Sequence, residues 1–225
     1  MQQRSLDLVE IYLKREHESP LIVKIVLALF NVATRSQETD EVELISKANR
    51  ILKAATTKPR GYPAGLSSEK ALSALKTFHS TASRSPAPET TKVCSLCSTF
   101  ICRSVLPEAS TEVVDVYRSS LIDLNTRKNS KVSPVLISDF VSKFPLAAWS
   151  LRNDIVKGCG EETVNLYRRS QNVQLLETMA TALAAQVSLH SALTLYSLMY
   201  NSSGPNKERQ NFKTFQTPQV LSSSV

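Results

Sequence analysis

Apolar residues recur at helical spacing through most of this chain, which limits it to folds built from amphipathic helices. In one stretch, Val114, Tyr117, Leu121 and Leu124 are spaced so that they share one helix face. The strict alternation typical of strands is almost absent. Glycine is scarce, and each one lies in a break between apolar-periodic segments: Gly61, Gly65, Gly158, Gly160 and Gly204. This distribution predicts helices joined by punctuated turns.

The periodicity predicts about ten helices, with caps or prolines at several of their ends. Ser133-Pro134 is one such start, a capping residue before a proline at the first helical position. Successive pairs of about 40 residues would pack as antiparallel hairpins, which predicts an all-α fold, an α-solenoid of the HEAT or armadillo kind. The predicted helices are 4–16, 20–34, 40–55, 68–82, 92–106, 111–126, 134–144, 146–157, 161–170 and 173–200, the last either whole or broken in two.

Loops and tail set the expected domain organisation. We predict one helical-repeat domain over 1–201, with irregular loops near 56–67 and 83–92. The remainder, 202–225, is polar and interrupted by prolines, which is typical of a disordered tail.

Cys94 and Cys97 form a C-x-x-C, a spacing used in zinc and redox sites. A structural zinc site needs a second pair of ligands, and the remaining cysteines and histidines supply none at suitable spacing. Both thiols instead share an apolar helix face with Ile101 and Val105. We therefore predict buried thiols that act as small hydrophobic groups and no metal site.

Neither the histidines nor the most apolar segment indicates a functional site. His79 and His190 fall on apolar faces, which favours structural roles. The apolar run over 20–33 contains Lys24 and is shorter than the roughly 20 residues that a bilayer span needs. We expect no cofactor, no small-molecule substrate and no membrane contact.

Basic residues concentrate in the middle of the chain, where 58–150 carries twelve basic and seven acidic side chains. A turn after the apolar repeat 111–126 gathers several of them, and a stacked solenoid could present them to phosphates. The alternative is a solvated helix end, because cations favour the C-terminal turn of a helix. The candidate nucleic-acid-binding residues are Arg127, Lys128 and Lys131 in the turn, Arg118 before it, Lys143 after it, and a smaller second pair, Arg168 and Arg169.

Aromatic residues do not support base recognition, because stacking on bases needs exposed rings beside the basic residues. Most of them fall on apolar faces instead and are predicted to be core residues: Phe78, Phe100, Tyr117, Phe140 and Phe144. Trp149, the single tryptophan, is expected to be a packing anchor between hairpins. Any nucleic-acid contact should therefore be to the backbone.

Three segments together carry a family resemblance: "LDLVEIYLKREHESPLIVKIVLALFNV", "ALSALKTFHSTASRSP" with "CSTFICRSVL", and "VVDVYRSSLIDLNTRKNSKVSPVLISDFVSKFPLAAWSL". Over roughly 5–155 the chain resembles the C-terminal region of the DNA polymerase phi family, also called the Myb-binding protein 1A family. The resemblance implies a nucleolar helical-repeat protein in ribosomal RNA gene transcription and ribosome biogenesis. Its implied partners are pre-ribosomal or transcription proteins, with ribosomal RNA or ribosomal DNA as further candidates. Members are much longer than this chain.

Three functional hypotheses follow. The first is a non-enzymatic nuclear scaffold that contacts RNA or DNA backbone through its basic surface. The second is a protein-only adaptor that holds partner helices in an apolar groove between hairpins. The third and weakest is an enzyme, because the chain lacks a carboxylate pair for two-metal polymerisation, a phosphate-binding glycine loop and a nucleophile with an identifiable base.

Overall fold

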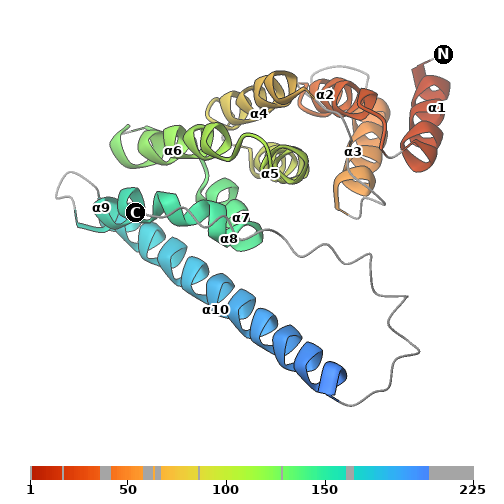
Figure 1. The fold of residues 1–225 in the computed structure, drawn as a ribbon. Coiled ribbons are helices and arrows are strands. Elements are labelled where there is room, and N and C mark those ends of the chain that lie inside the picture. Colours follow the sequence, from red (N-terminus) through yellow and green to blue (C-terminus); the bar gives the residue numbers. More distant parts are fainter. Residues whose placement is uncertain are drawn as a thin grey trace. The chain divides into compact units, whose positions relative to one another are not determined.

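The computed structural model describes residues 2–16, 18–35, 42–57, 63, 67–85, 87–127, 129–160 and 165–202 (Figure 1). Within these ranges every regular element is a helix, which confirms the predicted all-α fold. The chain divides into two compact units, Met1–Leu183 and Ala184–Val225. The helices are α1 (Gln2–Arg15), α2 (Leu21–Ala33), α3 (Val42–Thr57), α4 (Ser68–Ala82), α5 (Pro88–Val105), α6 (Ser110–Thr126), α7 (Pro134–Lys143), α8 (Pro145–Ala148), the 3₁₀-helix η1 (Trp149–Leu151), α9 (Arg152–Gly160) and α10 (Leu166–Ser202).

Helices in the first unit pack as overlapping pairs. α2 packs against α3, α4 against α5, and α6 against both α4 and α7. α5 also contacts α3 and α7, so it joins the earlier hairpins to the later ones (Figure 1). Each amphipathic helix thereby buries its apolar face against neighbours close in sequence, which is the construction of a helical-repeat protein. The predicted solenoid of stacked hairpins is confirmed for this unit.

Buried rings from four of these helices lie in contact with one another. Phe30 of α2 and Phe78 of α4 meet edge to face, with ring centroids 4.6 Å apart. Further along, Tyr117 of α6 meets the His79 ring of α4 edge-on at 4.4 Å and stacks on Phe140 of α7 at 3.9 Å. All five side chains are buried. Such aromatic pairs stabilise a core by about 0.5–1.5 kcal/mol beyond the area they bury.

The start of α7 has the predicted cap. The Ser133 hydroxyl accepts a hydrogen bond from the Val135 N–H at 3.4 Å, and Pro134 occupies the first turn. A Pro at this position loses no intrahelical hydrogen bond, since the first N–H groups of a helix have no carbonyl partner.

The start of α10 differs from the prediction. The sequence predicts separate helices over 161–170 and 173–200, whereas 166–202 is one continuous helix. Its cap is Asn165, whose side-chain oxygen accepts a hydrogen bond from the Arg168 N–H at 2.9 Å. Residues 161–164 lie outside the described ranges. The glycines at 158 and 160 belong to α9 and do not form the break that the sequence predicts.

Trp149 is not the packing anchor that the sequence predicts. The predicted helix 146–157 is divided into α8, η1 and α9. Because a 3₁₀-helix has fewer residues per turn than an α-helix, side chains after Trp149 point in other directions than a continuous α-helix would give them. The Trp149 side chain is 48% exposed, and the guanidinium carbon of Arg152 lies 4.4 Å from the ring centroid. The residue therefore carries a surface cation–π contact.

Two features bear on the predicted domain organisation. α5 begins at Pro88, inside the segment 83–92 for which the sequence predicts a loop. The expected tail falls outside the described residues except for Ser202, the last residue of α10. The boundary at 201 stays a prediction.

Candidate nucleic-acid interface

Hydrogen bonds hold the turn between α6 and α7 in place. The Arg127 N–H donates to the Asp123 carbonyl at 3.1 Å, and the Ser130 N–H donates to the Arg127 carbonyl at 3.1 Å. The Ser130 hydroxyl donates to Asp123 Oδ2 at 2.7 Å and accepts from the Val132 N–H at 3.2 Å. Val132 is buried and anchors the turn in the core. Backbone and side-chain hydrogen bonds together therefore fix the described residues of the turn.

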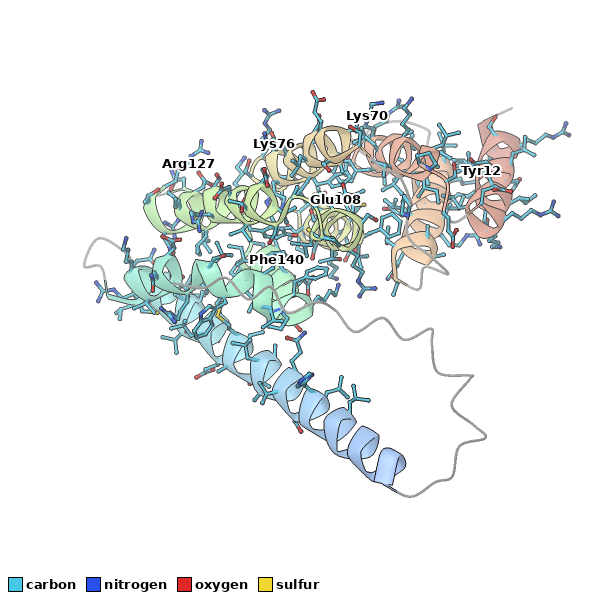
Figure 2. All side chains as sticks on the ribbon, in the orientation of Figure 1. Tyr12, Lys70, Lys76, Glu108, Arg127 and Phe140 are labelled. Atoms are coloured by element: carbon cyan, nitrogen blue, oxygen red, sulfur yellow. The ribbon has the colours of Figure 1, made fainter. Side chains whose placement is uncertain are left out.

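Among the described residues of this turn, Arg127 and Lys131 are the predicted cations that are presented to solvent. Figure 2 shows Arg127 at the end of α6, where its side chain is 64% exposed. Its guanidinium lies 3.6 Å from the Asp123 carboxylate, a surface pair worth about 0.3–0.5 kcal/mol. Lys131 is also exposed. Lys128 lies outside the described residues. The turn thus offers exposed positive charge, partly offset by one carboxylate.

Arg118 occupies a different place. Its Nε donates to Asp154 Oδ2 at 3.0 Å, and its Nη1 donates to Asp115. The side chain is 33% exposed, and Nη2 also reaches the Ser150 carbonyl at 3.5 Å. Two carboxylates therefore neutralise this arginine, which ties α6 to α9.

The other candidates are spread over further elements. Lys143 ends α7 and donates from Nζ to the hydroxyl of buried Thr99 on α5 at 3.3 Å. Arg168 and Arg169 are half-buried in the first turn of α10, where a positive charge opposes the helix dipole. Nine residues of helix, about 13 Å, separate Arg118 from Arg127. Of the predicted set, the described structure brings Arg127 and Lys131 together in the turn between α6 and α7, and Arg168 and Arg169 together at the start of α10.

Reactive side chains lie in the core. His79 Nδ1 is 2.7 Å from the Ser120 hydroxyl, and burial lowers the His79 pKa to about 3. Burial raises the pKa of Cys94 and of Cys102 to about 12 and raises that of Cys97 as well. These positions confirm the predicted structural roles of His79 and the C-x-x-C thiols. His190, in contrast, is exposed, so the apolar face on which the sequence places it is not buried at this residue.

As part of the adaptor hypothesis the sequence predicts an apolar groove between hairpins, and the structure has a groove between α3 and α5 whose position the sequence does not specify. The groove encloses about 950 Å³, and its lining includes Asp139 of α7. One wall presents Val42, Asn49 and Lys53 of α3, and the other includes Val93 of α5. These α3 residues are spaced so that they share one helix face. Because this face mixes polar and apolar residues, its sequence pattern is the same as that of an ordinary solvated helix surface. Only the packing of α3 against α5 makes it a groove.

Stacked helix hairpins with a solvent-facing groove and reactive groups held in the core define a helical-repeat protein. The family described as Myb-binding protein 1A-like, TPR repeats, matches residues 16–192, and the chain belongs to this family. TPR repeats are helix hairpins, as are the HEAT and armadillo types to which the sequence points. No curated protein and no solved structure matches the chain. Across the described residues, no helix is long and apolar enough to cross a membrane.

Proposed function

We propose that this chain is a non-enzymatic helical-repeat scaffold that acts in the nucleolus, in ribosomal RNA gene transcription and ribosome biogenesis. The observation that carries the proposal is membership of the Myb-binding protein 1A-like repeat family over most of the chain. Repeat stacks expose extended surfaces on which partners assemble. The family is named for a protein that binds Myb, which fits partners from transcription. Nucleotide polymerisation is not part of the proposal, although the family that the sequence resembles is also named after a DNA polymerase.

A scaffold fits the described chemistry better than an enzyme does. The Ser120–His79 pair has the composition of a nucleophile and a base, but both residues are buried, and a His pKa of about 3 makes a weak base. The thiols of Cys94 and Cys97 are equally buried and stay protonated. These groups support packing rather than turnover.

The nucleolar part of the proposal is tested in cells that carry the tagged chain at its own locus. We expect the tag to coincide with the sites of ribosomal RNA synthesis. Rapid depletion should lower incorporation of labelled uridine into precursor ribosomal RNA before it lowers messenger RNA labelling. A tag spread evenly through the cytoplasm, with unchanged precursor labelling after depletion, would refute the proposal.

The proposal also includes contact between this chain and the phosphate backbone of RNA or DNA. The exposed turn at Arg127 and Lys131 supports this contact. Binding to ribosomal RNA and to duplex DNA is measured across a salt series for the intact chain and for Arg127→Glu/Lys131→Glu. The salt slope for duplex DNA should become shallower by about 0.9 for every phosphate that the variant no longer neutralises. Lys70→Glu/Lys76→Glu on the exposed face of α4 is a matched control with the same change in charge (Figure 2).

A protein-only adaptor is the second candidate function. It is favoured by the two carboxylates that neutralise Arg118, because they remove one charge from the proposed basic surface. Equal binding, or none, by the turn variant and the control variant would favour this adaptor over the nucleic-acid scaffold.

A further inference from the structure

We infer that the groove between α3 and α5 binds an acidic amphipathic helix of a partner protein. The inference rests on the proposed scaffold function and names a surface through which it would act. A helix in a groove is recognised by apolar residues on one of its faces, with charges along the rim setting its orientation. The groove provides both features.

Apolar side chains line both walls. Val42, at the start of α3, is 58% exposed. Val93 and Leu96 face the groove from α5, one turn apart, and are half-buried. A space of about 950 Å³ between them takes several side chains of a partner helix. An occupant would cover apolar surface that the chain itself leaves in contact with water.

Positive charge predominates along the rim. Arg35, Arg50, Lys53 and Lys92 line the groove, against two carboxylates. Both carboxylates have partners in the chain, and so has Arg50, whose Nη2 donates to Glu10 Oε2 outside the groove at 3.1 Å. Glu89 accepts a hydrogen bond from Lys92 Nζ at 2.9 Å, and Asp139 accepts one from buried Ser95.

Lys53 of α3 is exposed and lies close enough to interact electrostatically with Glu89 of α5. The two walls therefore share one electrostatic environment at this point. The excess of cations favours an occupant with acidic flanks.

Two other occupants fit less well. Nucleic acid would place its phosphates beside the two carboxylates and would leave the apolar walls unused. A second copy of this chain carries a net charge of +7, so two copies repel each other, whereas an acidic helix is attracted.

The wall residue Asn49 adds a polar feature to the groove, because its side-chain oxygen is buried and has no hydrogen-bond partner within the described structure.

The test measures fluorescence anisotropy of a labelled synthetic peptide with the full chain. The probe is a helix-forming peptide of about four turns with leucines on one face and glutamates on the other, and a lysine-for-glutamate peptide is its control. We expect the glutamate peptide to bind and the lysine peptide not to bind. Val42→Asp and Lys53→Glu should each weaken binding several-fold and about tenfold when combined. Neither change should unfold α3, because both residues are exposed, and the acid introduced at Val42 lies at the helix start, where it is favourable.

Lys76→Glu makes the same charge change on α4 outside the groove, and it should leave peptide affinity unchanged. Equal affinity of all variants, or no binding of the glutamate peptide, would overturn the inference. So would a concentration-dependent dimer that Val42→Asp abolishes, or RNA binding that only Lys53→Glu reduces. The precursor labelling experiment does not depend on the groove, so the scaffold proposal can stand or fall independently.

Discussion

Asn172 of α10 donates a side-chain hydrogen bond to the side-chain oxygen of Asn125 on α6 at 2.8 Å. Both side chains are buried, at 0% and 9% exposure. The same Asn172 amide donates to the Arg168 carbonyl at 3.0 Å. A buried polar pair of this kind fixes which surfaces meet, because a shift of one helix along the other would leave the buried Asn125 oxygen without its donor. The pair therefore positions the first part of α10 on α6.

Asn125→Ala should lower the free energy of unfolding by about 1–3 kcal/mol, because it removes the acceptor and leaves a buried donor less well paired. Chemical denaturation followed by circular dichroism measures the loss. Ser119→Ala, on the exposed side of the same helix, is the control and should change stability by less than about 0.5 kcal/mol. A double-mutant cycle with Asn172→Ala should give a coupling of about 0.5–3 kcal/mol. Additive effects would mean that the pair does not act as a unit.

Gly158 faces the same pair. A Cβ added there would lie 2.5 Å from Asn125 Nδ2 and 2.7 Å from Asn172 Nδ2. Alanine in a helix is about 1 kcal/mol more favourable than glycine, but the overpacking should outweigh this gain. We expect Gly158→Ala to lower the free energy of unfolding by about 1–2 kcal/mol.

Gly160→Ala is the matched control in the same helix, because nothing lies within 4 Å of its added Cβ. It should leave stability unchanged or raise it by up to about 1 kcal/mol. If both alanine variants are stabilised equally, the close approach of Gly158 to the two amides does not affect the free energy of unfolding.

Stability should fall on mild acidification because of His79. Its pKa is about 3 in the folded protein, against about 6.5 when unfolded. Below about pH 6.5, His79 binds a proton in the unfolded chain but stays neutral in the folded chain. The free energy of unfolding therefore falls as the pH falls. Between about pH 7 and pH 5 the loss should approach 2 kcal/mol, and above about pH 7 this group adds no pH dependence.

His79→Leu isolates this effect, because leucine fills much of the space and does not titrate. The variant should be less stable at neutral pH, since leucine cannot bond to the Ser120 hydroxyl, but its stability should change much less between about pH 7 and pH 5. The slope of stability against pH is therefore the decisive quantity. A variant with the same slope as the natural chain would assign the acid sensitivity to other groups.

Thiol reactivity should separate the four cysteines. Cys94, Cys97 and Cys102 are buried, whereas Cys159 is only half-buried. Burial also raises the pKa of Cys159, so even this thiol should react more slowly than a free cysteine. Mass spectrometry after brief iodoacetamide treatment should find the label on Cys159 first, and denaturant should make all four sites react. Early labelling of Cys94 or Cys97 would indicate an accessible dithiol instead.

Local chemistry in the sequence predicts the elements whose ends it controls. Ser133 and Pro134 fix the start of α7, and the apolar repeat through Tyr117 and Leu121 fixes the buried face of α6. The environment of Trp149 could not be predicted in this way, because a short 3₁₀ turn changes the helical phase around it, which periodicity does not reveal.

The candidate sites depend on residues distant in sequence. Arg118 reads as an available cation in the sequence, yet its partner Asp154 lies 36 residues away. The groove likewise needs α3 to pack on α5, with α4 between them in sequence. The i,i+3 pair of Arg118 with Asp115 is visible in the sequence, but the bond to Asp154 and the groove leave no local signature, so the sequence alone does not reveal that the arginine is held by two carboxylates.

The position of α5 also determines how the first unit would respond to mechanical force. α5 contacts α2, α3, α4, α6 and α7, while α1 makes its main contacts with α3. Under tension applied at its two ends, this unit should lose its outer helices first, in small steps, because each is held by few neighbours. The piece around α5 should resist longest. Pulling would therefore open the groove wall formed by α3 before it disturbs the stacked rings of Tyr117 and Phe140.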